Sequence, residues 1–196
     1  MAAPEIYYIR HGQTDWNAEL RYQGQRDIPL NETGREQARH NGRTLHAVLG
    51  KAVGFTFISS PLGRARMTME LIRAEMGLST SEYAVADPLK EISYGDLEGV
   101  TQAEMKAANR ELYYERKSNM WTFRPNNGES HEDVVFRVSA WLETLESDQR
   151  YIVTAHGAIG RVMRHILVGL PPEQVERFAF PQDKVFRFKN GTEETL

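Results

Sequence analysis

The chain has 196 residues, with 24 Lys or Arg against 27 Asp or Glu, so its net charge is -3. This balance argues against nucleic acid or a membrane surface as a partner. The lack of cysteine excludes disulfides and thiol chemistry, and the length fits a single domain over residues 1–196. Because the first residues do not form a signal peptide and no apolar run reaches the ~20 residues of a membrane helix, we expect a cytoplasmic protein.

The first predicted strand, residues 5–9, is rich in Ile and Tyr and leads directly into Arg10, His11 and Gly12. Ligands of open α/β sheets bind beyond the carboxyl ends of the strands, so an Arg-His pair at this place favours an anionic ligand such as a phosphoryl group. The imidazole of His11 can then attack phosphorus. The polar stretch that follows, residues 14–31, is long for a loop in a compact domain, and such loops are usually functional.

Two helices are predicted in the next part of the chain. Thr33 begins a capping box for a helix that ends at Gly50. After a buried strand at residues 55–58, Ser60 and the proline that follows it predict a helix start, with Ser60 as the N-cap. Arg64 then lies in the first turn of that helix, close to the end of the strand.

The middle of the chain is expected to hold a strand near residues 83–85, a loop around Glu91, and a helix from the capping residue Thr101 to about residue 114. The segment that follows, Tyr114–Gly128, is aromatic and basic. It is either a lid over the pocket or ordinary packing. Its basic side chains could contact an anionic group of a substrate.

In the last third of the chain, Ser130 caps a helix in whose first turn His131 is expected to be exposed. A strand at residues 151–155 leads into His156 and Gly157, the second strand-to-His-Gly junction. The remaining predicted elements are a helix to Gly169, a hairpin or edge strands at residues 177–180 and 184–188, and a frayed end from residue 190. This alternation of strands and helices predicts an α/β fold, a three-layer α/β/α sandwich with a mostly parallel mixed sheet.

Four motifs occur in a fixed order along the chain. They are Arg10-His11-Gly12, the arginine motif Ser59–Arg66, the acid motif Leu89–Glu91 with Gly95, Glu98 and Gly99, and His156-Gly157. Together they resemble the motifs of the histidine phosphatase superfamily, which includes cofactor-dependent phosphoglycerate mutases and many small phosphatases. The resemblance extends from residue 6 to about residue 168, and it implies a phosphoglycerate mutase-like fold and catalysis through a phosphohistidine.

The motifs supply the groups that phosphoryl transfer needs. Arg10 and Arg64 match phosphate oxygens with their planar forks, and they disfavour protonation of a nearby imidazole, which lowers its pKa. His11 can therefore attack as a neutral nucleophile. His156 is expected to donate a hydrogen bond to a phosphate oxygen, and the helix after it adds a positive dipole end.

The resemblance favours Glu91 as the general acid, which protonates the leaving alcohol and then deprotonates the attacking water. Glu98, in the same loop, is the alternative acid or a structural residue. Matching to the family also suggests that Asn17, Gln23 and Gly24 contact substrate, and that Gly128-Glu129-Ser130 lies near the site.

Three other functions compete with that of a phosphatase. A zinc site on His11 and His156 is disfavoured because the arginines beside them repel a cation and no close His or Cys spacing is present. A mutase is disfavoured because Gln23 stands where the family's mutases carry Thr, and because the chain is too short for their insertion after the acid motif. A protein that only binds a phosphorylated ligand would lack a catalytic group, whereas all five are present.

We therefore predict a phosphatase that hydrolyses phosphomonoesters through a phosphohistidine on His11. No cofactor and no metal are expected, and the expected partner is a small phosphorylated metabolite. The sequence identifies neither that metabolite nor the oligomeric state.

Overall fold

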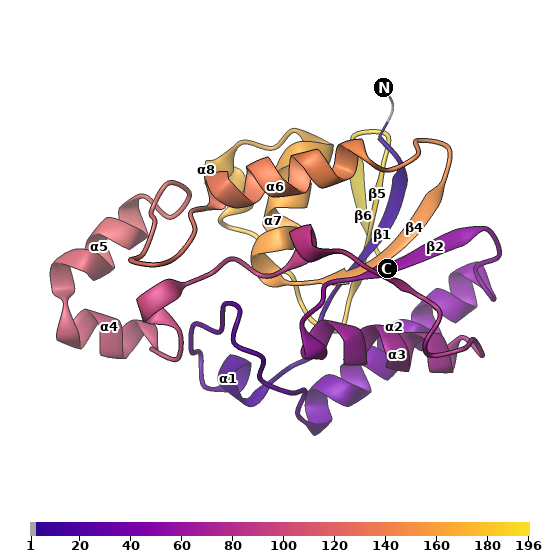
Figure 1. Ribbon diagram of the computed structural model, residues 1–196, viewed down its shortest axis with the longest axis horizontal. Helices are drawn as coiled ribbons and strands as arrows, with labels where there is room; N and C mark the ends of the chain where they lie inside the picture. Colours follow the sequence, from indigo (N-terminus) through magenta and orange to yellow (C-terminus); the bar gives the residue numbers. More distant parts are fainter. Residues whose placement is uncertain (1–2) are drawn as a thin grey trace.

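A computed structural model describes residues 3–196, and within them six strands form one mixed sheet with helices on both faces (Figure 1). The strands are β1 (Glu5–Arg10), β2 (Phe55–Ser59), β3 (Ala84–Val85), β4 (Arg150–Ala155), β5 (Val185–Lys189) and β6 (Thr192–Thr195). Their order is β3-β2-β4-β1-β5-β6, with the first four parallel and the last two antiparallel to their neighbours. The predicted mixed, mostly parallel sheet between helical layers is confirmed.

The α-helices lie on the two faces of the sheet and beyond it. They are α1 (Asp15–Ala18), α2 (Glu32–Leu49), α3 (Gly63–Glu75), α4 (Gln102–Ala108), α5 (Arg110–Ser118), α6 (His131–Glu143), α7 (Gly157–Val168) and α8 (Pro172–Val175). Helices α2 and α3 cover one face of the sheet, and α6 and α7 cover the other. Helices α4 and α5 lie away from the sheet, at the left of Figure 1. Two single 3-10 turns, η1 (Asp87–Leu89) and η2 (Gly95–Leu97), connect β3 to α4.

Strand β1 separates the two cores. Its side chains alternate between the faces of the sheet, as in any strand. Ile6 and Tyr8 pack into the core under α6 and α7, whereas Tyr7 and Ile9 pack into the core under α2 and α3. All four are buried, which explains why this strand has no polar face in the sequence.

The carboxyl ends of three neighbouring parallel strands meet at one edge of the sheet, where β4 lies between β1 and β2. The backbone N–H of His11 donates to the carbonyl of Ala155, and that of Ser60 donates to the carbonyl of Thr154, each at 2.9 Å. His11, Ser60 and His156 directly follow the three strands. The sheet therefore brings these side chains to the edge where ligands of such folds bind.

The start of α2 differs from the prediction. The N-cap is Asn31, whose side-chain oxygen accepts the backbone N–H of Gly34 at 2.9 Å, and Thr33 lies exposed inside the helix. Asn31 also donates to the side chain of Gln13 at 3.1 Å, which fastens the helix to the loop after β1. The predicted end at Gly50 is correct.

The predicted N-cap at Ser60 is also wrong. Helix α3 begins at Gly63, and its flanking residue Leu62 makes no side-chain cap. Asp27, from the loop after β1, accepts the backbone N–H of Gly63 at 2.7 Å and of Arg64 at 3.4 Å. A carboxylate that is distant in sequence therefore caps the helix, and the Ser60 hydroxyl is left for another partner.

The predicted helix from Thr101 is two helices. Thr101 makes the expected capping box, but the chain turns at Asn109, which ends α4 and caps α5 by accepting the N–H of Leu112. The prediction of an exposed His131 is wrong as well, because its ring stacks on the buried Trp121 at 5.1 Å between centroids. Both aromatic rings belong to the packing between α6 and the segment before it.

The C-terminal hairpin lies later in the chain than predicted. Residues 177–180 are not a strand, and residues 192–195, predicted to be frayed, form β6, which pairs with β5. The turn is Asn190-Gly191, with φ of 50° and 75°. An Asn-Gly pair is the usual signal for a two-residue hairpin turn, so the sequence held the information that placed this turn.

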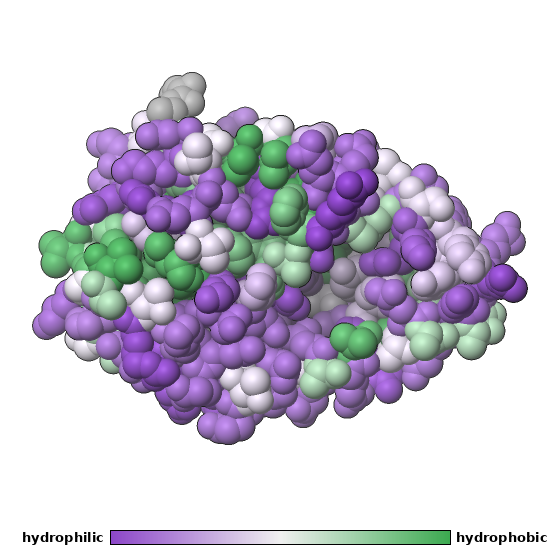
Figure 2. Space-filling view, turned by 180° about the vertical axis from the view of Figure 1, so that it is seen from behind, coloured by the Kyte–Doolittle hydropathy of each residue, from purple (hydrophilic) through white to green (hydrophobic). Residues whose placement is uncertain are grey.

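The surface is mostly hydrophilic, with a smaller number of apolar residues (Figure 2). Leu20, Val53 and Phe136 are the most exposed of the large apolar side chains. None of the helices described for residues 3–196 combines the length and the apolar character needed to cross a membrane.

The two candidate caps of α2 can be compared directly. Asn31→Ala should lower the free energy of unfolding by about 1 kcal/mol, because it leaves the N–H of Gly34 without its acceptor. Thr33→Ala, the matched control at an exposed helix position, should cost less than half of that. Urea unfolding of both variants measures the difference. A larger cost for Thr33→Ala would contradict the cap assignment.

Candidate active site

A cavity of about 380 Å³ opens at the carboxyl ends of β1 and β4. Seven of the eight residues singled out from the sequence line it: Arg10, His11, Asn17, Gln23, Gly24, Arg64 and Glu91. The eighth, His156, is buried beside His11, with 5.1 Å between the ring centroids. A larger hollow of about 740 Å³, bordered by Leu142 and Leu145, contains none of these residues and no basic side chain.

Nε2 of His11 is the ring nitrogen that can act as a nucleophile. Nδ1 lies 2.7 Å from the carbonyl of Gly12, which can only accept, so Nδ1 carries the proton. Nε2 therefore holds the lone pair, and it accepts from Arg64 Nε at 3.2 Å. Burial lowers the pKa of His11 well below its ordinary value, and the charges of Arg64 and Arg10 lower it further. The ring is thus kept neutral, with Nε2 facing the guanidinium of Arg64.

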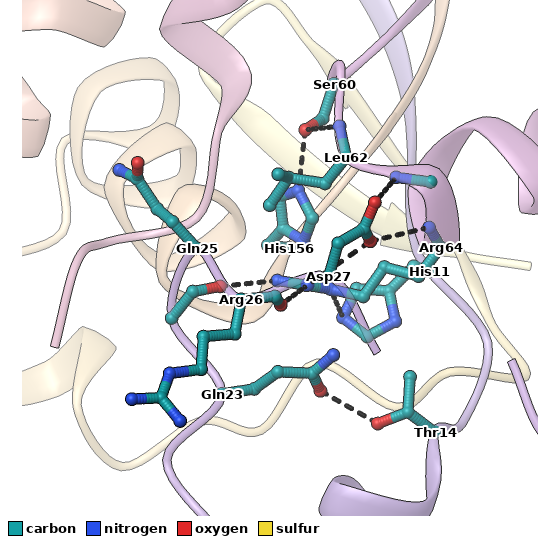
Figure 3. A network of polar contacts seen from close by, with 12 residues as sticks. His11, Thr14, Gln23, Gln25, Arg26, Asp27, Ser60, Leu62, Arg64 and His156 are labelled. Atoms are coloured by element: carbon teal, nitrogen blue, oxygen red, sulfur yellow. Dashed lines mark hydrogen bonds and ion pairs between the residues drawn. The ribbon is translucent and has the colours of Figure 1, made fainter. Parts of the chain in front are cut away.

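Arg64 is the most enclosed charge of the site, with 1% of its surface exposed. Besides His11, it donates to the carbonyl of Arg26 at 2.7 Å and to that of Gly24 at 2.6 Å (Figure 3). Burial lowers the pKa of Arg64 to about 10, so it remains a cation at neutral pH. Three of its five N–H groups are used in this way, and Nη1 also lies 3.9 Å from the carboxylate of Asp27.

Gly24 holds the loop in place for Arg64. Its φ is 53°, a left-handed conformation that other residues rarely adopt, and a Cβ there would lie 2.0 Å from the carboxylate of Glu98. The sequence suggested a substrate contact for Gly24. In the structure it lines the cavity, and its carbonyl is engaged by the guanidinium of Arg64.

The buried nitrogens of the site without a hydrogen-bond partner among the described residues include Arg10 Nε and His156 Nδ1. Arg10 is anchored through Nη1, which donates to the carbonyl of Phe180 at 3.1 Å. His156 is anchored through Nε2, which lies 2.7 Å from the Ser60 hydroxyl. Each side chain is therefore held by one nitrogen and keeps another unpaired.

Ser60 holds the ring of His156. Its hydroxyl oxygen accepts the backbone N–H of Leu62 at 3.4 Å and lies 2.7 Å from His156 Nε2 (Figure 3). When the hydroxyl donates to Nε2, the proton of the neutral ring is on Nδ1. Burial and the charge of Arg64 hold the pKa of His156 well below its usual value. In that tautomer the unpaired Nδ1 is a donor suited to an anion.

The carboxyl group of Glu91 packs against the N-terminus of α7. Its Oε1 accepts the backbone N–H groups of Ile92 at 3.0 Å and Ala158 at 3.2 Å. Its Oε2 makes one longer contact, 3.4 Å from the backbone nitrogen of Ala158. Gly157 separates it from Arg10: a Cβ at Gly157 would lie 3.6 Å from Arg10 Cζ and 3.8 Å from Glu91 Oε2. The absence of a side chain at Gly157 leaves room for a ligand between the cation and the carboxyl group.

A pair of charged residues supports the Glu91 loop. Arg137 of α6 bonds to Glu129 at 3.0 Å, and it also donates to the carbonyls of Pro88 and Glu91. Glu129 in turn accepts the backbone N–H of Ser93 at 2.9 Å. The sequence suggested that residues 128–130 lie near the site, and they do so as a brace behind Glu91.

Glu98 has a different environment from Glu91. Its Oε1 accepts the backbone N–H groups of Gln25 at 2.9 Å and Tyr94 at 3.3 Å, and its Oε2 lies 3.6 Å from Arg26. It does not line the cavity. These contacts support the structural alternative for Glu98, in which it fixes the loop around Gly24.

A chain of amide side chains forms the wall next to His11. Thr14 donates to Gln23 Oε1 at 2.8 Å and Asn17 donates to the same oxygen at 3.3 Å, so Gln23 Nε2 is left buried without a partner among the described residues. Gln182 donates to Asn17 at 2.9 Å and to the carbonyl of His11 at 3.1 Å. The amide of Gln23 is thus oriented with its donor unpaired.

Sequence reasoning missed the contact of Ser60 with His156 and several residues that line the cavity, among them Tyr94, Arg161 and Gln182. Arg161 lies four residues after Gly157, and this helical spacing could have revealed it.

The segment Tyr114–Gly128 contributes no residue to the lining of the cavity, although Arg116 lies 4.6 Å from the ring of Tyr22, which does line it. Whether this segment acts as a lid stays a prediction.

The arrangement can hold a tetrahedral anion between a lone pair and a carboxyl group. Arg64 donates to Nε2 of His11, and Arg10 and His156 each keep a buried nitrogen without a partner among the described residues. Glu91 and Arg10 both border Gly157. Among residues 3–196, no three or more His, Asp or Glu side chains are grouped so as to hold a metal ion. The chemistry that these groups support by themselves is attack on phosphorus with proton transfer to the leaving oxygen.

The protonation states of the two imidazoles can be measured. Because the pKa values of His11 and His156 lie well below the ordinary value, both rings should stay neutral as the pH falls from about 8 to about 5.5. Nitrogen NMR should show both protons on Nδ1. Ser60→Ala should alter the signals of His156 and leave those of His11 unchanged. Titration of His11 near its ordinary pKa would contradict this description.

Comparison with known proteins identifies the family of the chain. The model of the histidine phosphatase superfamily, branch 1, matches residues 6–194. The 2,3-bisphosphoglycerate-dependent phosphoglycerate mutase 2 of Gloeobacter violaceus is 35% identical over 177 residues, which are 88% of this chain and 79% of that protein. The 2,3-bisphosphoglycerate-dependent mutase of Azorhizobium caulinodans is 31% identical over 97% of this chain and 94% of its own.

Solved structures with this fold include phosphatases. Mycobacterial glucosyl-3-phosphoglycerate phosphatase is 29% identical, with a TM-score of 0.79, and the match covers 94% of this chain and 89% of that one. The alpha-ribazole phosphatase of Shigella flexneri is 25% identical, with a TM-score of 0.78 over 93% of this chain and 89% of that one. With the family match over nearly the whole chain, these likenesses establish that the chain belongs to branch 1 of the histidine phosphatase superfamily.

Proposed function

We propose that the protein hydrolyses phosphomonoesters through a phosphohistidine at Nε2 of His11. The observation that carries this proposal is the pair of buried, unpartnered nitrogens, Arg10 Nε and His156 Nδ1, beside a neutral nucleophile. An unpaired buried donor is costly, and a phosphoryl oxygen would satisfy both. Gln23 has a further free donor on the same cavity.

In the first step, Nε2 of His11 forms a bond to phosphorus as the bond to the ester oxygen breaks. Arg10, Arg64 and His156 stabilise the charge on the three equatorial oxygens. Glu91 donates a proton from Oε2, its less engaged oxygen, to the departing alcohol. The hydrogen bond from Nδ1 of His11 to Gly12 stabilises the charge that the ring acquires as the new bond forms.

In the second step, water attacks the phosphohistidine from the side that the alcohol has left. The carboxylate of Glu91, now without its proton, accepts a proton from that water. The bond between phosphorus and Nε2 breaks, and inorganic phosphate and the neutral imidazole are restored. One carboxyl group thus serves as acid and then as base, so the site returns to its starting protonation after each turnover.

We infer a small phosphorylated metabolite as the substrate. Support comes from the size of the cavity, about 380 Å³, which suits a small ester rather than a protein loop. The structural relatives act on small phosphorylated compounds by their names, glucosyl-3-phosphoglycerate and alpha-ribazole phosphates. A cytoplasmic location is proposed with this, because a metabolite phosphatase without cysteine needs no oxidising compartment.

Mutase activity is the second candidate, because the curated relatives are phosphoglycerate mutases by name. A mutase must keep water away from its phosphohistidine while the intermediate reorients. No residue of Tyr114–Gly128, the segment expected to close the site, lines the cavity here. Water access to the intermediate therefore favours hydrolysis.

The acid role of Glu91 can be tested through the leaving group. Glu91→Gln should slow release of the alcohol from an alkyl phosphate in the first turnover by about 100- to 10,000-fold, and should slow release of nitrophenol from an aryl phosphate far less. A good leaving group hardly needs a proton. Glu98→Gln is the control and should not discriminate between the two esters. Equal losses on both esters in Glu91→Gln would move the acid role to another group.

Phosphatase and mutase can be separated with 3-phosphoglycerate. Release of inorganic phosphate should exceed formation of 2-phosphoglycerate, with or without added 2,3-bisphosphoglycerate. His11→Ala, which lacks the nucleophile, is the control and should abolish both reactions. Rapid isomerisation with little free phosphate would establish the mutase instead.

A further inference from the structure

Two neighbouring hollows lie along α6, apart from the active-site cavity. The larger, about 740 Å³, is lined by α6, α7, residues 3–4 and residues 145–148, and the smaller, about 450 Å³, is lined by α6 alone. They share Ser139 and Glu143, and neither shares a residue with the cavity that contains His11. We propose that together they form a docking groove, the α6 groove, for a basic amphipathic helix of a partner protein. This inference goes beyond the proposed function and does not rest on it.

The floor of the α6 groove is apolar. Four partly buried side chains at the outer edge of the core line the larger hollow: Leu142, Leu145, Ile166 and Leu167. Phe136 lines the smaller hollow, with 81% of its surface exposed. Contiguous apolar surface with a polar rim is typical of protein-binding sites, because a partner removes that surface from water.

The rim of the groove is acidic. Its charged side chains are Glu132, Glu143, Glu146 and Asp148, all of them exposed. No Lys, Arg or His of residues 3–196 lines either hollow. Within the same part of the chain, none of the four carboxylates makes an ion pair. Unneutralised negative charge around an apolar floor complements a partner that carries Lys or Arg beside apolar side chains.

The same charges disfavour other occupants of the groove. A twofold contact with a second copy of the chain would place the acidic rim against its own equivalent. Like charges that meet at an interface cost several kcal/mol. Nucleic acids and anionic membrane surfaces carry the same sign of charge as the rim. A cationic protein segment is the occupant that gains from both the rim and the floor.

The course of the groove favours a helical segment. Residues of α6 that line the smaller hollow recur every three or four positions, as one face of a helix does: Glu132, Val135, Phe136, Ser139, Ala140 and Glu143. The groove therefore runs along α6, which at 13 residues is about 20 Å long. Ser139 and Ala140 are small and lie midway along this face, where they let another helix approach closely. Helices recognised in such grooves carry apolar anchors at the same spacing.

A designed peptide tests the α6 groove. The probe is a helical peptide of about 14 residues with Leu at every third or fourth position and Lys or Arg between, and its counterpart has Glu in place of each Lys or Arg. We expect the basic peptide to bind with a Kd in the micromolar range, more weakly at high salt. It should shift the methyl NMR signals of Leu142, Leu145 and Ile166 and leave the ring signals of His11 unchanged. The acidic peptide should not bind.

Charge reversal tests the rim. The double variant Glu143→Lys, Glu146→Lys should weaken binding of the basic peptide by about tenfold or more, and it should bind the acidic peptide, which the parent does not. Glu111→Lys with Glu115→Lys is the matched control, because these exposed acids of α5 give the same change in net charge outside the groove. An equal loss in the control would show unspecific attraction and overturn the groove.

Phe136→Ser tests the floor. The ring is so exposed that the fold does not depend on it, and its loss should weaken binding of the basic peptide by about three- to tenfold. The proposal is overturned if the basic peptide does not bind, if it binds the Phe136→Ser variant as tightly as the parent, or if its NMR shifts lie outside the groove. Self-association of the chain that Phe136→Ser abolishes would assign the groove to a second copy instead. Binding of anionic lipid vesicles through the groove would likewise overturn the basic helix.

Discussion

A guanidinium buried against an imidazole determines how the site is built. A charge removed from water as fully as that of Arg64 is tolerated only with hydrogen-bond partners on most sides. Its partners are Nε2 of His11 and two carbonyls of the loop after β1. That loop reaches Arg64 because Gly24 adopts a left-handed conformation against Glu98. The contacts of Arg64 therefore order the loop and disfavour protonation of the nucleophile, whose tautomer is fixed by the carbonyl of Gly12.

The nucleophile and the acid group are positioned by helices from opposite layers of the sandwich. The nucleophile is set by β1 and by Arg64 from α3, which belongs to the layer of α2 and α3. The carboxyl group of Glu91 is set by the N-terminus of α7 and by Arg137 from α6 in the other layer. Because the sheet joins the layers, the packing of both cores controls the separation between His11 and Glu91.

The wrong local predictions have different causes. Thr33 and Ser60 have the residue type and spacing of helix caps, but Asn31 and Asp27 supply the caps of α2 and α3. Asp27 is far from α3 in sequence, so no local pattern could reveal it. The hairpin turn at Asn190-Gly191 is different, since the pair is a local signal that was overlooked. At α3 the local rule thus fails because a polar group distant in sequence accepts the backbone N–H, whereas at α2 one local cap residue, Asn31, takes the place of another.

The sequence by itself determined most of the order of strands and helices up to Gly169, the layered α/β architecture and the residues of the four motifs, because period, glycine position and strand ends are local features. Seven of its eight site residues line one cavity. Only the tertiary structure decided which nitrogens are left unpaired, that Ser60 orients His156 and that Arg161 enters the cavity. These features depend on contacts between residues about 100 positions apart, such as Ser60 and His156. The sequence alone does not reveal them, because packing in three dimensions decides which polar atoms find a hydrogen-bond partner.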